Sequence, residues 1–172
     1  TAWMGLPDVA YPTDSEDWAH CLTLPRELSL KDGKLIQQPV RELVALRKEQ
    51  ALSESGLLSE AKHFERSGAN CYELKLDVAF PATADYAPVT VDLCEDAAND
   101  KRFRITLDPN TKKITIDRSR CGIPFAEEFG TTRTLALGQM DEVKLQIFVD
   151  TSSIEIFVND GEGTFTSRVF PE

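Results

Sequence analysis

The spacing of apolar positions changes near residue 55 and separates the chain into regions with different patterns. From Ser55 onward apolar and polar residues alternate with a period of two, as in Tyr72, Leu74 and Leu76, which predicts half-buried strands. The same alternation continues over residues 89–94, 103–107 and 113–117. Several short strands at even spacing, with little helix between them, favour a β-sandwich.

The C-terminal stretch VKLQIFVDTSSIEIFVNDGEGTFTSRVF predicts three further strands. Phe148 and Phe157 have the opposite parity to Ile147 and Ile156, so these strands are apolar on both faces. Strands of this kind belong near the middle of a packed assembly. The run Asn159-Asp160-Gly161 offers the positive-φ residues that a tight hairpin prefers.

Residues 1–30 have a different character. They combine prolines and short apolar runs with Trp3, Tyr11 and Trp18, as closely packed strands joined by tight turns would. About thirty residues cannot bury these aromatic side chains alone. We therefore expect the segment either to be poorly ordered or to bury itself against the sandwich or another copy of the chain.

The sequence of residues 31–54 indicates a connector between the two flanking regions. The region opens with a turn at Asp32-Gly33 and continues as PVRELVALRKEQAL. Pro39 suits the start of a helix, and the apolar residues after it would share one side, which predicts a short amphipathic helix: Val40, Leu43, Val44 and Leu46. The chain therefore divides into 1–30, a linker with a short helix at 31–54, and a β-sandwich domain at 55–172.

Composition and charge narrow the class of partner. The 172 residues are 41% hydrophobic and 28% charged, a globular balance, and the formal net charge is −10. This charge would repel phosphate backbones and anionic lipids, and no apolar run approaches the roughly 20 residues of a membrane-spanning helix. We expect no nucleic acid or membrane partner. The four scattered cysteines include no CxxC pair and favour free thiols in a reducing cytoplasm over disulfides.

Side chains with catalytic chemistry are present without a self-contained arrangement. Asp8 and Asp14 could act as paired carboxylates, but aspartate prefers turns, and that interpretation is favoured. Glu155, between two isoleucines, could be an acid with a raised pKa; a structural position that faces solvent or pairs with an arginine, such as Arg168 in the following strand, is favoured.

The remaining candidates are single residues. His20 and His63 have no second ligand nearby, so no metal site is expected. Trp3 and Trp18 could stack on a sugar, although two tryptophans in such a region are more often part of a core. The sequence contains neither a GxSxG elbow nor a GxxxxGK phosphate loop.

A series of motifs spread over nearly the whole chain resembles a known family. In order they are WMGLP, YPTD, LTLPREL, QQPVREL, DRSRCG, FVDTSSIEIFVNDGE and FTSRVFP. They resemble the C-terminal part of glycoside hydrolase family 32 enzymes, the β-fructofuranosidase group of invertase and sucrose-6-phosphate hydrolase. The resemblance implies a mostly β chain: a C-terminal β-sandwich preceded by a short linker helix and the last strands of a five-bladed β-propeller. Residues 1–30 would then be a remnant of the last propeller blade.

The resemblance also implies which site residues to expect. The family's nucleophilic aspartate lies in a WMNDPNG motif, its stabilising aspartate in an RDP motif and its acid/base glutamate in an EC motif; none occurs here. WMGLPD lacks the Asn-Asp pair, so Asp8 is not assigned as nucleophile and no catalytic residue is expected. Trp3 matches a tryptophan that lines the family's sugar pocket, although Ala2 precedes it where a glycine is usual. No cofactor or metal is implied.

These observations predict a fragment of a cytoplasmic β-fructofuranosidase that is structural and inactive by itself. Its partner would be an upstream propeller domain of the same enzyme, and it could form a homodimer. The alternatives are a lectin-like β-sandwich module that binds carbohydrate and a purely structural interaction domain. The sequence leaves open whether the full enzyme acts on sucrose, sucrose 6-phosphate or a fructan.

Overall fold

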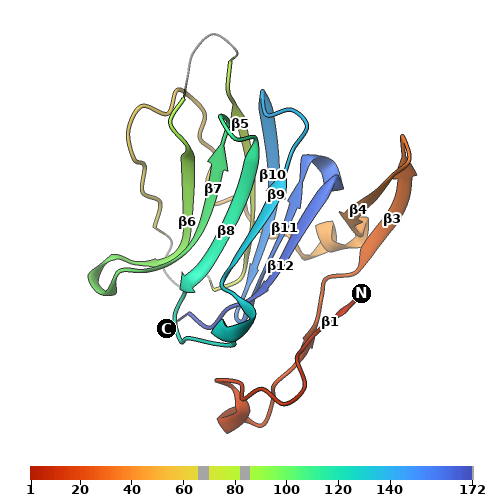
Figure 1. Ribbon diagram of the computed structural model, residues 1–172, viewed down its shortest axis with the longest axis vertical. Helices are drawn as coiled ribbons and strands as arrows, with labels where there is room; N and C mark the ends of the chain where they lie inside the picture. Colours follow the sequence, from red (N-terminus) through yellow and green to blue (C-terminus); the bar gives the residue numbers. More distant parts are fainter. Residues whose placement is uncertain (66–69, 82–85, 172) are drawn as a thin grey trace.

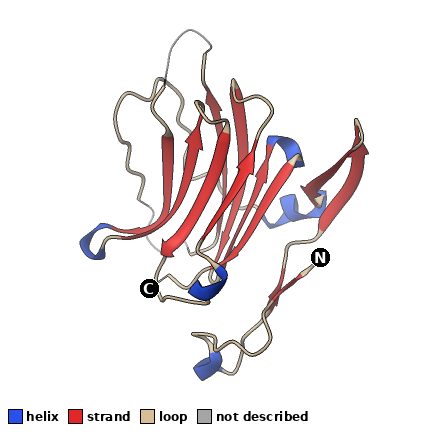
Figure 2. Cartoon of the chain, in the orientation of Figure 1, coloured by secondary structure: helices blue, strands red, loops and turns tan. Residues whose placement is uncertain are grey.

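Two antiparallel four-stranded sheets face each other in the computed structural model, which describes residues 1–65, 70–81 and 86–171 (Figures 1 and 2). The first sheet has the order β12-β11-β10-β5. Its strands are β5 (Tyr72–Ala79), β10 (Glu142–Asp150), β11 (Ser153–Val158) and β12 (Gly163–Arg168). The second sheet has the order β6-β7-β8-β9, formed by β6 (Val89–Asp96), β7 (Lys101–Asp108), β8 (Lys113–Arg120) and β9 (Thr132–Ala136). The predicted β-sandwich is confirmed.

The core lies between the inner faces of the two sheets. On β7, inward Phe103, Ile105 and Leu107 are fully buried, and the residues between them are more exposed. The facing sheet contributes the alternate residues of β10 and β11, including Leu145, Ile147, Ile154 and Ile156. Burying each large aliphatic or aromatic side chain contributes about 1.5 to 3 kcal/mol, so this alternation is the main source of the sandwich's stability.

Strand β11 is buried along all six of its residues. Its alternate residues Ile154, Ile156 and Val158 face the core, and Ile156 lies opposite Ile147 in β10. The residues of the other parity, Glu155 and Phe157, lie on the outer face and are also buried. The prediction that these strands are covered on both faces is therefore confirmed for β11.

The cover over this outer face comes from the strands of residues 1–39, called the N-terminal segment below. Strand β1 (Trp3–Met4) pairs with β2 (Cys21–Leu22), and β3 (Arg26–Lys31) pairs with β4 (Lys34–Pro39). Figure 1 shows both pairs on the β12 side of the sandwich. The β3–β4 hairpin turns at Asp32 and Gly33, with φ of 52° and 75°. This hairpin therefore crosses the boundary predicted between residues 30 and 31. The division of the chain into domains stays a prediction.

The predicted short helix of the connector is present as η2 (Arg41–Leu46), but it is a 3-10 helix with no buried residue, so the predicted amphipathic packing is wrong. Pro39 cannot begin a helix because it lies in β4 opposite Arg26. Most helical stability in proteins comes from packing an apolar face, and here Val44 and Leu46 remain exposed. The end of η2 is fastened to the sandwich by Arg47, whose guanidinium donates to both carboxylate oxygens of Glu73 at 2.5 and 2.6 Å.

The remaining short helices are single 3-10 turns in the connections. They are η1 (Asp14–Glu16), η3 (Ala97–Asn99), η4 (Glu127–Phe129) and η5 (Asn159–Gly161). In η5, Asn159, Asp160 and Gly161 all have positive φ, of 47°, 56° and 96°, as predicted for this hairpin. A Cβ built on Gly161 would lie 2.3 Å from the carbonyl oxygen of Gln37, so this turn also packs closely against β4.

We expect Gly161→Ala to destabilise the chain by about 1 to 3 kcal/mol, because alanine is strained at this φ. The new methyl group would also push β4 away from the turn. Chemical denaturation measures the change, with Gly138→Ala as the matched control, since nothing lies within 4 Å of a Cβ at Gly138. Equal stability of the two variants would show that this contact does not hold the hairpin.

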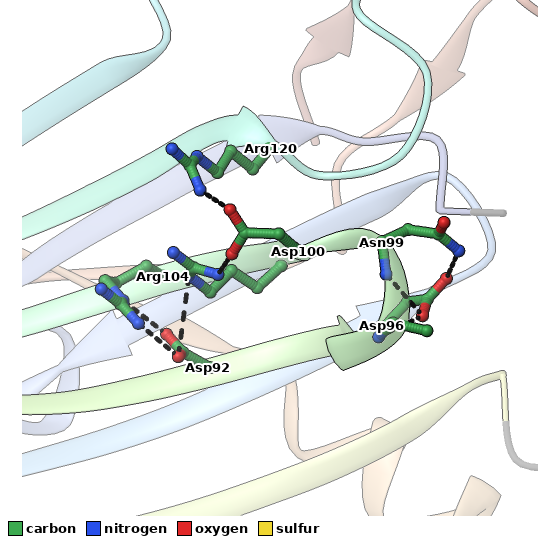
Figure 3. Close-up of polar contacts among 8 residues, drawn as sticks. Asp92, Asp96, Asn99, Asp100, Arg104 and Arg120 are labelled. Carbon is green, nitrogen blue, oxygen red and sulfur yellow. Dashed lines mark hydrogen bonds and ion pairs between the residues drawn. The ribbon is translucent and has the colours of Figure 1, made fainter.

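An ion-pair network covers the outer face of β6, β7 and β8 (Figure 3). The carboxylate of Asp92 accepts two hydrogen bonds from Arg104, at 2.7 and 2.6 Å, and Asp100 pairs with both Arg102 and Arg120. Beside it, Asp96 caps η3, and the side-chain amide of Asn99 lowers the pKa of Asp96. Exposed ion pairs of this kind contribute little to stability each.

Two further sequence expectations concern the cysteines and the membrane. The structure holds Cys21, Cys71, Cys94 and Cys121 as free thiols. Within the described ranges, no helix is long and apolar enough to span a membrane.

Candidate functional site

A cavity of about 370 Å³ lies where the N-terminal segment meets the sandwich. Its walls come from β1 and the residues after it, from β8 and the loop around η4, and from β12. The volume falls at the lower end of the range typical of small-molecule sites, roughly 300 to 1,000 Å³. The predicted substrate-binding residue, Trp3, is part of the wall.

Trp3 remains 53% exposed. Its ring meets that of His20 edge-on at 5.0 Å between centroids, and a Cβ on Gly5 would lie 2.3 Å from the indole. Glycine at position 5 therefore leaves the space that the Trp3 ring occupies. Trp18 has a different role, because the guanidinium of Arg168 lies over its ring at 5.7 Å. The assignment of Trp3 as a substrate-binding residue stays a prediction.

An aromatic cluster attaches the N-terminal segment to the sandwich. Tyr11 is 5% exposed and packs against Phe125, with centroids 4.7 Å apart, and Phe125 in turn contacts Phe170. The Tyr11 hydroxyl accepts a hydrogen bond from the Leu6 amide at 2.6 Å. Of the outcomes expected for residues 1–30, the structure shows burial against the sandwich, although Trp3 and Leu6 stay exposed.

Arg168, in β12, is the central cation of this contact. Its side chain is buried, its Nε donates to the carbonyl of Ser152, and its Nη1 donates to the carbonyls of Met4 and Ala19. The guanidinium also lies over three rings, those of Tyr11, Trp18 and Phe170, at 5.0 to 5.7 Å. A single arginine thus joins β1 and the loop between β1 and β2 to the sandwich.

Glu155 has the expected structural role and pairs with an arginine, but the partner is Arg26 and not Arg168, and the side chain does not face solvent. It is 3% exposed, and its two oxygens accept from the Leu24 amide and from Arg26 Nη2, both at 2.6 Å. Arg26 also lies over the Phe157 ring at 5.2 Å. Cross-strand pairing points to the neighbouring strand β12, whereas the partner of Glu155 belongs to a segment 129 residues earlier. Glu155 is therefore a buried structural anion.

The other acidic candidates occupy turns, as favoured from the sequence. Asp14 accepts a hydrogen bond from the Tyr11 amide at 2.8 Å, and Asp8 is exposed with a φ of 60°. His63 lies at the surface, 3.7 Å from Glu95. Among the described residues, no group of three or more His, Cys, Asp or Glu side chains is placed to hold a metal ion.

Sequence reasoning missed two arginines on the cavity wall, Arg118 and Arg133. Arg118 donates to the carbonyls of Phe125 and Ala126, and Arg133 Nη2 donates to the carbonyl of Phe129 at 2.9 Å. Both arginines therefore hold the loop around η4. Burial lowers the pKa of Arg118, and the nearby positive charge of Arg133 lowers it further. In the sequence they are surface-like charges in strands, with no signal that a loop would fold around them.

The fold and the pocket define the class: an all-β sandwich protein with a half-exposed tryptophan and several arginines in a cavity at one side. Comparison with known families then gives the family. Residues 42–172 match the family model "Glycosyl hydrolases family 32 C terminal", and residues 1–39 match "Glycosyl hydrolases family 32 N-terminal domain". The chain belongs to glycosyl hydrolase family 32, which confirms the resemblance seen in its motifs.

The relatives include sucrose-6-phosphate hydrolases. Those of Staphylococcus xylosus and Streptococcus mutans are each 41% identical over 99% of this chain. The solved structure of sucrose-6-phosphate hydrolase from Lactobacillus gasseri has 34% identity and a TM-score of 0.83, again over 99% of this chain. The chain spans only about a third of these proteins, 33%, 32% and 33% of their lengths respectively.

Proposed function

We propose that this chain is the C-terminal part of a β-fructofuranosidase of the sucrose-6-phosphate hydrolase type and has no hydrolase activity by itself. The observation that carries the proposal is the match of the whole chain to one third of such enzymes. Retaining glycoside hydrolysis needs two placed carboxyl groups about 5 to 5.5 Å apart. The family's three carboxylate motifs are missing from the sequence, and Asp8 and Asp14 serve turns.

The role of the chain in the full enzyme would be to hold an upstream propeller. On this proposal residues 1–30 belong to the last propeller blade, 31–54 form the linker, and 55–172 form the stabilising sandwich. Arg168 and Glu155 join the first of these regions to the third through buried contacts. Several large apolar side chains of the N-terminal segment remain exposed and would cover the propeller or a second copy of the chain: Trp3, Leu22, Leu28, Leu30 and Leu35.

Trp3 would contribute to sugar binding in the complete enzyme. This proposal rests on the family motif and on the half-exposed position of the ring in the cavity wall. An indole face suits the apolar side of a sugar ring. The reaction would need no metal or cofactor, because two carboxyl groups catalyse retaining hydrolysis. The enzyme would act in the cytoplasm without a nucleic acid or membrane partner.

The purified chain should release no reducing sugar from sucrose or sucrose 6-phosphate above a control without protein. The reason is the missing carboxylate motifs. The assay measures reducing ends over time, with the complete sucrose-6-phosphate hydrolase of Streptococcus mutans as the positive control. Turnover that survives repurification of the chain and disappears in Asp8→Ala would overturn the proposal.

A lectin-like binding module is the second candidate, supported by the cavity and by the exposure of Trp3. If the chain binds neutral sugar without a propeller, sucrose or fructose should change its tryptophan fluorescence in a saturable way. The change should be lost in Trp3→Ala and kept in Trp18→Phe, which preserves an aromatic ring under Arg168. If no saturable change in fluorescence is observed, the binding-module candidate is rejected and only the fragment role remains.

A further inference from the structure

Two of the four free cysteines lie together in the core of the sandwich. Cys94 is in β6 and is half-buried, and Cys121 directly follows β8 and is 5% exposed. Cys121 belongs to the core cluster between the two sheets, and Cys94 packs against that cluster. The thiol of Cys121 shares a hydrogen bond with the thiol of Cys94. The two sulfur atoms are therefore in contact, although β7 separates their strands.

The backbone departs from the regular sheet at both cysteines. The pairing of β6 with β7 shifts its register between Leu93 and Asp96, and Cys94 within this bulge has a φ of 52°. This left-handed conformation is uncommon for cysteine, and residues held in it gather at functional sites. On the other strand, the Cys121 amide donates to the carbonyl of Arg118 at 3.0 Å, so the chain turns directly after β8. These two irregularities allow the thiols to meet on the inner side of the sheet.

The two thiols differ in acidity and in access. The hydrogen bond with Cys121 lowers the pKa of the Cys94 thiol, although burial opposes this effect. The same hydrogen bond and burial raise the pKa of the Cys121 thiol, so Cys121 keeps its proton. Oxidants react with the thiolate and not with the thiol. Cys94 is also the more exposed of the two, so an oxidant reaches Cys94 first, with Cys121 beside it.

We propose that Cys94 and Cys121 form a reversible disulfide bond when the protein meets hydrogen peroxide. The Cys94 thiolate attacks one oxygen of the peroxide, which gives a sulfenic acid and releases hydroxide. The Cys121 sulfur then attacks the Cys94 sulfur: the S–S bond forms, the S–O bond breaks, and the hydroxyl group leaves as water with the Cys121 proton. The two sulfurs together lose two electrons, and the peroxide is reduced. The proposal is independent of any hydrolase activity.

The bond would link β6 to the end of β8. Neighbouring strands lie about 4.7 to 4.9 Å apart, so regular strands on either side of β7 would be roughly 9 to 10 Å apart. A disulfide joins Cα atoms about 4.4 to 6.8 Å apart. The bulge and the turn shorten the distance, and closing the bond draws β6 further toward β8. Disulfides that distort their surroundings are more easily reduced, which suits the transient disulfides of a reducing compartment.

Peroxide treatment of a chain that keeps only this pair of thiols tests the proposal. Cys21→Ser and Cys71→Ser remove the other two thiols, and circular dichroism checks that the fold is kept. After treatment at neutral pH, free thiols are alkylated in denaturant and the intact mass is measured. The expected product is a monomer that has lost two hydrogen atoms and takes up no alkyl group, and dithiothreitol should restore both thiols. A product that still takes up two alkyl groups, or a disulfide-linked dimer, would overturn the proposal.

Two variants with a single thiol, made on the same background, test the order of the steps. In the Cys121→Ala variant Cys94 remains alone, and dimedone should capture its sulfenic acid after peroxide treatment. In the Cys94→Ser variant the buried Cys121 remains alone and should stay unlabelled over the same time. Labelling of Cys121 but not of Cys94 would contradict the assigned roles. The mass measurement on the intact pair does not depend on these variants, so the proposal stays testable if loss of a core thiol unfolds the chain.

Discussion

Glu155→Gln is expected to destabilise the chain by about 3 to 5 kcal/mol, because it leaves Arg26, whose side chain is only 13% exposed, without its counter-charge. The carboxylate is 3% exposed and accepts from Arg26 and from the Leu24 amide at 2.6 Å each. Glutamine keeps the shape of the side chain but removes its charge and turns one acceptor into a donor. A small effect would be expected only if Glu155 faced water or an arginine at the rim of the sheet. Chemical denaturation monitored by circular dichroism measures the change.

Glu142→Gln is the matched control on the adjacent strand β10. Its carboxylate is 59% exposed and lies 3.7 Å from Lys144, so the stability should change by no more than about 0.5 kcal/mol. Replacing both members of the buried pair, as Glu155→Leu with Arg26→Met, should recover much of the loss, because no buried charge then remains unpaired. Similar stabilities of Glu155→Gln and Glu142→Gln would mean that the pair does not hold the N-terminal segment in solution.

Phe157→Ala should cost about 3 to 5 kcal/mol by leaving a cavity on the outer face of β11. The ring is 2% exposed, meets Phe148 edge-on at 5.9 Å and lies under the Arg26 guanidinium at 5.2 Å. A domain of this size has only about 5 to 15 kcal/mol of total stability, so much of it would unfold at moderate denaturant. The midpoint of urea unfolding, compared with the parent chain, measures this.

Phe129→Ala controls for loss of an aromatic ring as such, since Phe129 is 52% exposed in η4. It should unfold close to the parent chain. Phe157 and Glu155 both contact Arg26, so their effects should not add in the double variant. A Phe157→Ala variant as stable as Phe129→Ala would show that the N-terminal segment does not cover β11 in solution.

The sandwich was predictable because its strands carry their signal locally. The alternation of Phe103, Ile105 and Leu107 with polar residues indicates which face of their strand is buried. The opposite parity of Phe148 and Phe157 indicates that the second face of their strands is also covered. Turn residues with positive φ marked the hairpin at Asn159-Asp160-Gly161. Each of these features depends on residues within a few positions of one another.

The connector and the charged residues were less predictable because their partners are distant. A 3-10 helix replaced the expected amphipathic helix, since the structure supplies no surface for the side of Val44 and Leu46. The partner of Glu155 lies in a strand separated from it by most of the chain, and no local pattern distinguishes Arg26 from other arginines. The arginines of the cavity wall were missed for the same reason. Trp3 was recognised only through a family motif.

The covered outer face of β11 also determines how far the chain can be shortened from its N-terminus without loss of the fold. The change in periodicity suggests residue 55 as the first residue of a separate domain, but a polypeptide starting there would lack Leu24 and Arg26, which satisfy Glu155. It would present a carboxylate and the Phe157 ring to water across the middle of a sheet, a surface prone to association between copies. A shortened chain that folds independently should therefore begin before Leu24 and retain the β3–β4 hairpin. We therefore expect the smallest chain that folds by itself to be larger than the β-sandwich alone.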